Sequence, residues 1–326
     1  MALLNVPGVK ARADVGGPVI DAEVRSAQPQ IPVRQILAGG AARVLPTQAL
    51  SMDKMGFEEV DGIEIPRVVA NNFAGEKSGK THWAFTAPPP IAVISFDTGT
   101  EMIAKKFRRQ GKRILYKFHD VDLTSKDQGR HEREWEHIKA SFESIVNNKD
   151  VRTGIIDTGT EMWELCRLAR FGKLTQVMPH HYGPVNNEFR DLIKMSYDRP
   201  DLNMIWIHKV KKEYVKKGNS DKEAAWNGKY ERAGFGDMPY LVDLNIENYR
   251  RPGQADWGEG NVVFGVKVID CRQNPDVIGL QIGAEGDLQD RGLSWTGVEG
   301  DFSTFSSLAS LIYADHPEAQ HERYWK

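Results

Sequence analysis

Residues 74–81 read Ala-Gly-Glu-Lys-Ser-Gly-Lys-Thr and stand between an apolar run, Val68-Val69-Ala70, and a segment around Ala84-Phe85 that can be helical. The stretch matches the pattern G-x-x-x-x-G-K-[ST], with Ala74 at the place of the first glycine. This pattern constrains the fold because it needs a strand before it and a helix N-terminus after it. Backbone N–H groups and the helix dipole then attract negative charge, so the stretch predicts a phosphate-binding loop.

The loop predicts a nucleotide site that uses Mg²⁺. Lys80 is expected to reach the β- and γ-phosphates, and the Thr81 hydroxyl to bind Mg²⁺. The residues expected to contact the nucleotide are Ala74, Gly75, Glu76, Lys77, Ser78, Gly79, Lys80, Thr81 and His82. A surface turn rich in glycine and lysine is the alternative interpretation. No motif that reads the base is visible, so ATP and GTP both remain open.

Length, charge and cysteine usage narrow the class of protein. The 326 residues suffice for one large or two modest domains, and the net charge of −2 requires any nucleic-acid binding to come from a local patch. Cys166 and Cys271 are the only cysteines, which excludes a disulfide framework and favours the cytoplasm. No run of 18 apolar residues occurs and the start lacks the pattern of a secretion signal, so we expect no membrane partner.

Predicted strands and helices alternate from about residue 62. Strands are expected at 65–73, 91–97, 113–118, 153–157 and 203–208, and helices at 81–86, 100–110, 130–147, 161–171 and 186–197. This alternation is typical of a parallel sheet with helices on both faces. After about 212, strands at 229–232, 240–245 and 262–271 are expected to be antiparallel and to extend or flank the sheet, before a closing helix at 302–313.

The pattern divides the chain into three parts. Residues 61–280 form the predicted α/β core, and 281–326 a C-terminal extension with the closing helix. Residues 1–60 are rich in Ala, Gly, Pro, Val and Gln without a sustained period, which indicates an extended or partly disordered segment. A small cap packed on the core, or an arm that docks on a neighbouring subunit, are the alternatives for this segment.

The sequence Asp-Thr-Gly-Thr-Glu-Met occurs twice, at 97–102 and 157–162, each time after an apolar strand. We interpret the two copies as equivalent strand ends that meet at one site. An Asp that ends a buried strand can complete the shell of Mg²⁺, and Asp157 is the candidate because two strands fit between it and Lys80. The alternative role of Asp157 is to cap the next helix, and one residue can do both.

Hydrolysis needs a group that orients or deprotonates the attacking water. Asp97, Glu101 and Glu161 all follow strand ends, where the sites of open parallel sheets lie. Glu101 is preferred because the strand before it is expected to neighbour the phosphate-loop strand; its alternative is an acid in the first turn of a helix. His208 ends the strand 203–208 and is expected either to contact the γ-phosphate or to be structural.

These segments together resemble the RecA/Rad51-like ATPase core, and more closely the phage-type P-loop proteins often described as nucleotide-binding or AAA-domain proteins, which include the Sak4-like recombinases. The resemblance covers about 62–280 and rests on the loop and on five further segments: 96–101, 155–165, 184–189, 205–209 and 270–275. It implies a RecA-like P-loop fold and an ATP-dependent protein acting on single-stranded DNA in phage recombination, annealing or replication. It also implies a homo-oligomer in the host cytoplasm, with a phage replication or single-strand-binding protein as a further partner.

One departure from the resemblance concerns the general base. RecA-like proteins usually carry the catalytic Glu directly after Asp-Thr or Asp-Ala at the second strand end, and here Gly99 stands at that place. The base therefore stays open among Asp97, Glu101 and Glu161, and weak hydrolysis is expected.

Two basic runs, 105–113 and 209–217, are candidates for contact with DNA, with an ordinary solvated surface as the alternative. The second run follows the strand of His208, and in RecA-like filaments the loop there faces DNA or the neighbouring subunit. Residues 226–232 mix aromatic and basic side chains, which favours a packed hairpin and allows stacking on bases. Arg232 or Lys211 has the right residue type to complete a neighbour's ATP site. Residues 180–182 are expected in a loop, without a zinc pattern.

Three functions fit the phosphate loop. The leading one is an ATPase that oligomerises on single-stranded DNA, and its turnover should respond to DNA. The second is a nucleotide-dependent assembly switch with a protein partner and no DNA role. The third is a small-molecule kinase, which the absence of an arginine-rich lid segment and the β-rich C-terminal part disfavour.

Overall fold

The computed structural model describes residues 66–173, 178–216, 224–252, 262–283 and 304–326. All of them belong to one compact unit, Gly62–Lys326. The predictions for residues 1–60 lie outside the described residues.

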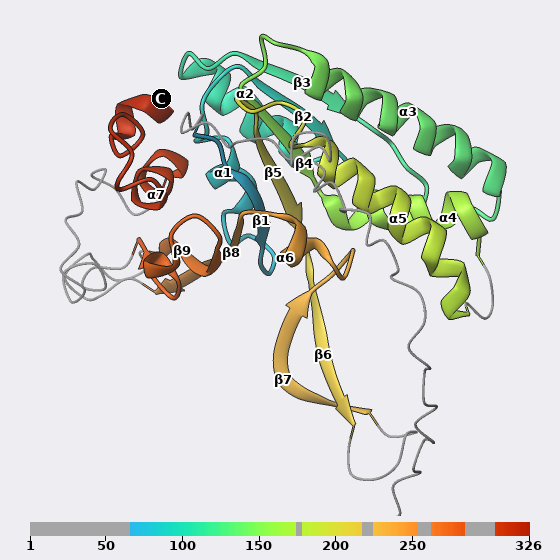
Figure 1. Cartoon of the computed structure of the whole chain (residues 1–326). Helices are drawn as coiled ribbons and strands as arrows, with labels where there is room; N and C mark the ends of the chain where they lie inside the picture. Colours follow the sequence, from blue (N-terminus) through green and yellow to red (C-terminus); the bar gives the residue numbers. More distant parts are fainter. Residues whose placement is uncertain (1–65, 174–177, 217–223, 253–261, 284–303) are drawn as a thin grey trace, which may run out of the picture. The chain divides into compact units, whose positions relative to one another are not determined.

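An eight-stranded sheet forms the centre of this unit (Figure 1), in the order β10-β9-β8-β1-β5-β4-β2-β3. Neighbours from β8 to β3 pair in parallel, whereas β9 pairs antiparallel with both β8 and β10. The strands are β1 (Val69–Phe73), β2 (Ile91–Ser95), β3 (Ile114–Phe118), β4 (Thr153–Asp157), β5 (Asn203–His208), β8 (Leu244–Pro252), β9 (Val262–Cys271) and β10 (Gln281–Ile282). The predicted fold, a mainly parallel sheet with antiparallel strands toward the C-terminus, is confirmed.

Helices cover both faces of the sheet because its central strands carry apolar side chains on both sides. In β5, Ile205 and Ile207 enter one core, while Met204 and Trp206 enter the other. The first core holds α1 (Lys80–Ala84), α2 (Thr100–Arg109), α7 (Phe305–Ile312) and the 3₁₀ turn η4 (Glu322–Trp325). The second holds α3 (Gln128–Asn147), α4 (Gly159–Phe171), α5 (Pro179–Met195) and α6 (Met238–Leu241). The closing helix α7 therefore packs on the same sheet as the phosphate-loop helix.

Several predicted boundaries differ from the structure, and two of these differences change the assignment of residues. Helix α5 begins at Pro179 rather than at 186, so residues 180–182 are helical and not in a loop. A proline in the first turn is well tolerated, and the helix continues through Pro184 because burial of Val185 and Phe189 against the second core outweighs one lost backbone hydrogen bond. The strand expected from 240 begins at Leu244 instead, because the residues before it form α6.

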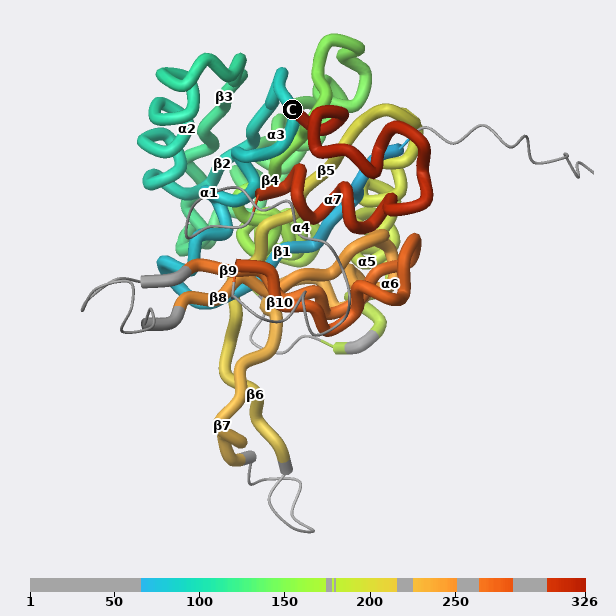
Figure 2. The backbone as a smooth tube through the Cα atoms, turned by 90° about the vertical axis from the view of Figure 1, so that its left-hand side faces the viewer, coloured from blue at the N-terminus to red at the C-terminus, as the bar shows by residue number. Residues whose placement is uncertain are grey.

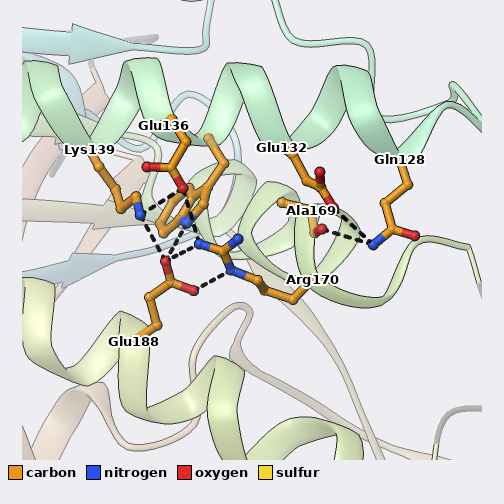
Figure 3. A network of polar contacts seen from close by, with 8 residues as sticks. Gln128, Glu132, Glu136, Lys139, Ala169, Arg170 and Glu188 are labelled. Atoms are coloured by element: carbon orange, nitrogen blue, oxygen red, sulfur yellow. Dashed lines mark hydrogen bonds and ion pairs between the residues drawn. The ribbon is translucent and has the colours of Figure 1, made fainter.

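Polar contacts around Glu188 tie three helices of the second layer together (Figure 3). The carboxylate of Glu188, on α5, accepts hydrogen bonds from Trp135 Nε1 at 2.8 Å and Lys139 Nζ at 3.1 Å, both on α3. Arg170 on α4 donates to Glu188 as well, and also to Glu136 at 3.2 Å. Burial opposes the charge of Glu188, but the hydrogen bonds from Arg170, Trp135 and Lys139 outweigh it and hold the pKa of this carboxyl at about 2.

Acid is expected to weaken this helical layer through Glu188. Because the pKa of Glu188 lies below its ordinary value, its stabilisation is complete above about pH 5 and is lost as the pH falls toward 2. Protonation of Glu188 should therefore lower the free energy of unfolding of the wild type by about 2 kcal/mol between pH 6 and pH 3. Urea unfolding of wild type and Glu188→Gln at both pH values measures this loss.

The exposed Glu143, on α3, provides the matched control as Glu143→Gln. Glu188→Gln should flatten the pH dependence of stability, whereas Glu143→Gln should keep the wild-type slope. Equal slopes in all three proteins would contradict the role of Glu188.

Candidate functional site

The carboxyl ends of four parallel strands lie in one row. Phe73 of β1 is opposite His208 of β5, and Asp157 of β4 is opposite both Ile207 and Ser95. The segments that follow these strands therefore meet at one edge of the sheet, as sites of open parallel sheets do. The two Asp-Thr-Gly-Thr-Glu-Met copies are neighbours there, but they are not equivalent: Asp157 is the last residue of its strand, whereas Asp97 lies beyond the end of β2.

The predicted phosphate loop connects β1 directly to α1. Gly79 has a φ of 89° and Lys77 a φ of 53°, so two residues of the loop adopt a left-handed backbone conformation before the helix begins. Ser78 Oγ donates to the carbonyl of Gly75 at 2.8 Å and closes the turn. Ala74 is not in the left-handed region, which explains why alanine can stand at the place of the first glycine.

A cavity of about 550 Å³ opens over this loop. All nine residues predicted to contact the nucleotide, 74–82, line it. The remaining lining residues come from the neighbouring strand ends, from α2 and from β9: Asp97, Ile103, Asp157, Thr158, Lys209, Val210 and Phe264. Ligand cavities in proteins commonly measure a few hundred to about 1,000 Å³, so the space suits a nucleotide.

Lys80 lies at the floor of this cavity. Its Nζ donates to the carbonyls of Ala74 at 2.9 Å and Gly75 at 2.7 Å. Burial lowers the pKa of Lys80, Asp157 opposes that shift, and the positive charge of Lys209 adds to it. Two ammonium groups thus share one cavity, and a phosphate is the kind of anion that would stabilise both.

Asp157 faces the loop from β4 and is almost completely buried. Its Oδ2 accepts hydrogen bonds from Thr81 Oγ1 at 2.9 Å and from Thr100 Oγ1 at 2.6 Å. Burial raises the pKa of Asp157 although both hydroxyl hydrogen bonds favour the charged form. A buried carboxylate beside a hydroxyl offers the hard oxygen ligands that Mg²⁺ prefers, so Thr81 and Asp157 fit a magnesium site.

The three candidate bases occupy different places. Asp97 lines the cavity, and its Oδ1 also accepts the N–H of Gly99 at 2.8 Å. Glu161 pairs with Thr158 and Lys209, which both line the cavity. Glu101 does not line it, and its half-exposed carboxylate pairs with Lys105 at 2.6 Å.

The reason for preferring Glu101 was wrong. The strand before it, β2, lies between β4 and β3, and two strands separate β2 from the phosphate-loop strand β1. From α2 it is Thr100, and not Glu101, that contacts Asp157.

His208 lies behind the cavity rather than in it. The ring is fully buried and packs against Gly159 and Gly234. A Cβ atom at Gly159 would lie 2.7 Å from the ring, so a side chain there would clash with His208. Burial and the charge of Arg232 hold the pKa of His208 well below its ordinary value, so the ring is neutral. Its Nε2 has no hydrogen-bond partner among the described residues. The next residue, Lys209, reaches the cavity instead.

Several residues of the site were not predicted from the sequence. Ile103, Thr158 and Phe264 line the cavity, and Thr100 holds the carboxylate of Asp157. Thr100 could have been found, because it stands in the repeated motif. Phe264 carried no local signal, since it comes from β9, far along the chain.

The basic run 209–217 is not a loop. Its described part forms β6 (Val210–Lys216), which pairs with β7 (Ala224–Arg232) in a separate two-stranded ribbon. Figures 1 and 2 both show this ribbon extending away from the sheet. The predicted hairpin is present, but it is not packed. Its large aromatic side chains are 46–59% exposed: Tyr214, Trp226 and Tyr230.

Two further basic residues, Lys112 and Arg232, are held by backbone carbonyls. Lys112 donates to the carbonyls of Thr86 and Ala87, both at 2.7 Å, and burial lowers its pKa to about 8. Arg232 donates to the carbonyls of Ala233 and Phe235, and burial lowers its pKa to about 10. Lys211 remains at the surface, 3.2 Å from Glu231.

The described ranges contain no group of three or more His, Cys, Asp or Glu side chains arranged for a metal ion. None of their helices has both the length and the apolar character needed to cross a membrane.

Similar solved structures include the RadB recombinase and a prototypical ATPase from the type III secretion system of pathogenic bacteria. The RadB match is 11% identical, with a TM-score of 0.37, and covers 67% of this chain and 86% of that chain. The secretion ATPase match is 11% identical, with a TM-score of 0.37, and covers 55% of this chain and 50% of that chain.

No curated protein sequence matches this chain. A family model described as AAA domain matches residues 72–278, which is more than half of the chain and includes both the phosphate loop and Asp157. The chain therefore belongs to the AAA domain family.

Proposed function

We propose that the chain binds and hydrolyses ATP in the 550 Å³ cavity and that, as an ATPase, it acts on single-stranded DNA. The observation that carries the nucleotide part is the contact of Thr81 with the buried Asp157, directly beside Lys80. Lys80 would bind phosphate oxygens, and Thr81 and Asp157 would hold Mg²⁺. When bound, the metal supplies positive charge that stabilises the charge developing on the transferred phosphoryl group.

We assign the orientation of the attacking water to Asp97. Of the three candidate acids, it is the one that lines the cavity, and its charge acts on both Lys80 and Asp157. Its Oδ1 bond to the N–H of Gly99 fixes the carboxylate in one orientation. A base must lie within hydrogen-bond reach of the water, and Glu101 is directed to Lys105 instead.

The β6–β7 ribbon is the proposed DNA-binding surface. Lys212 is paired with Tyr230 and Tyr214 with Trp226, so these four side chains share one face. Lys212 Nζ lies 5.0 Å from the ring centroid of Trp226, and the Trp226 and Tyr230 rings are 5.8 Å apart. Exposed aromatic rings beside lysines are what single-stranded DNA needs for stacking and for phosphate contact.

The alternative is a nucleotide-dependent assembly switch in which the ribbon docks on a protein. Glu213 and Glu231 give this ribbon negative charges as well, and a protein partner tolerates these better than DNA does. In either case we propose a homo-oligomer, in which the exposed Lys211 is available to a neighbour's site.

Fluorescence anisotropy with a labelled oligo-dT tests the DNA part. Trp226→Ala removes a stacking ring and is expected to weaken binding about 5- to 100-fold. Tyr240→Ala is the matched control, because Tyr240 is an exposed aromatic residue on α6, outside the ribbon.

Steady-state ATP hydrolysis with and without the same oligonucleotide completes the test. Stimulation by DNA is expected for the wild type. Turnover that is indifferent to DNA, together with no anisotropy change, would exclude the DNA role and favour the assembly switch.

A further inference from the structure

Lys209 joins the nucleotide cavity to the ribbon. It is the residue between β5 and β6, and it lines the cavity together with the phosphate loop. Its Nζ forms an ion pair with Glu161 of α4. The Lys209 side chain is 54% exposed and that of Glu161 only 19%, so the lysine is the less confined partner of the pair.

The carboxylate of Glu161 is held in place from its other side. Thr158 Oγ1 donates to it, and Thr158 also caps α4 by accepting the N–H of Glu161. Thr158 lines the cavity while Glu161 does not. The ion pair therefore draws the ammonium of Lys209 toward the wall of the cavity and away from its centre.

The main chain of Lys209 is fixed while its side chain can move. Its N–H donates to Thr160 Oγ1 at 3.0 Å, and its carbonyl accepts the N–H of Ala233 at 2.8 Å. These bonds close the base of the β6–β7 ribbon. A lysine stem of four carbons can reorient without disturbing either bond.

We propose that Lys209 binds the terminal phosphate of a nucleoside triphosphate, and that Glu161 holds it back until the triphosphate arrives. This inference rests on the proposed function. The neighbouring His208 cannot take this role, because its ring is buried and neutral behind the cavity. A triphosphate carries more negative charge than a diphosphate, so it competes better with Glu161 for the ammonium. The pair thereby makes the site discriminate between ATP and ADP.

Isothermal titration of the full chain with Mg·AMP-PNP and with Mg·ADP measures this discrimination. The wild type should bind the triphosphate analogue more tightly than ADP. Lys209→Met is expected to reduce this preference about 5- to 30-fold, the loss of one charge-assisted phosphate contact, while ADP affinity stays near the wild-type value. Lys209→Arg keeps the charge and should keep most of the preference.

Glu161→Gln tests the restraint on Lys209 separately. Removing the carboxylate charge frees the ammonium, so affinity for AMP-PNP should rise several-fold and affinity for ADP should not change. Glu164→Gln and Lys194→Met are the matched controls, because these residues form ion pairs outside the cavity, at 2.7 Å with Arg167 and at 3.5 Å with Asp191. Both controls should bind like the wild type.

The outcomes separate this inference from the proposed function. If Lys209→Met weakens both nucleotides equally, Lys209 does not bind the terminal phosphate selectively. If Glu161→Gln fails to raise the affinity for AMP-PNP, the restraint by Glu161 is wrong. Nucleotide binding itself stands in both cases. If the wild type binds neither nucleotide, the proposed function is wrong and the inference falls with it. Thermal unfolding of every variant confirms that a lost preference does not come from a lost fold.

Discussion

Lys80→Ala is expected to abolish nucleotide binding while leaving the fold intact. Within the described ranges, the Nζ of Lys80 donates to carbonyls of the loop itself, those of Ala74 and Gly75. Burial lowers the pKa of Lys80, which means that its charge is a cost to the protein until an anion compensates it. The substitution therefore removes no contact on which the core depends.

The effect on affinity should be large. Hydrogen bonds from an ammonium group to phosphate oxygens contribute about 1.5–3 kcal/mol each, so losing them weakens ATP binding about 100-fold or more. Titration calorimetry with Mg·ATP measures the loss, and thermal unfolding checks the fold. Lys194→Ala, a surface lysine on α5, serves as the control. Full ATP affinity in Lys80→Ala would mean that residues 74–81 are only a surface turn.

The fold was predictable where burial is complete. The predicted strands at 153–157 and 203–208 match β4 and β5 residue for residue. Every residue of both strands is buried, and each strand has apolar residues at its centre. The start of α5 was not predictable, since Pro184 argues locally for a boundary that packing on the second core overrides. The ribbon was predicted only in part, as a packed hairpin at 226–232. Its exposure and its partner strand β6 were missed, because β6 and β7 pair with each other with little burial.

The candidate site, like the fold, was predictable only in part. The phosphate loop and Asp157 were predicted from local patterns, and in the structure Thr81 Oγ1 of the loop lies 2.9 Å from Asp157 Oδ2. The expected neighbour of the loop strand was wrong because strand order depends on crossovers that no local pattern reveals. The repeated motif shows the limit well. Its second threonine holds the Asp157 carboxylate in one copy, as Thr100, and the backbone of Lys209 in the other, as Thr160.

Asp157→Asn should separate metal-dependent turnover from nucleotide binding. Asparagine has the same shape, and its carbonyl oxygen can still accept the hydroxyls of Thr81 and Thr100. The substitution removes the carboxylate charge that fits Mg²⁺, so turnover is expected to fall about 100-fold or more, with a smaller loss of nucleotide affinity.

Stability should move in the opposite direction. The pKa of Asp157 is raised in the folded chain, so its ionised form at pH 7 destabilises the protein when no cation compensates it. Asp157→Asn is then expected to unfold at a higher temperature than the wild type in the absence of Mg²⁺ and nucleotide.

Turnover, titration calorimetry and thermal unfolding together decide the role of Asp157. Asp191→Asn, an exposed acid on α5, is the control and should match the wild type in all three. A variant that kept wild-type turnover would show that Asp157 only positions the two threonines. A variant that lost stability would show that its charge is compensated within the protein, which leaves no unbalanced carboxylate for Mg²⁺ to neutralise.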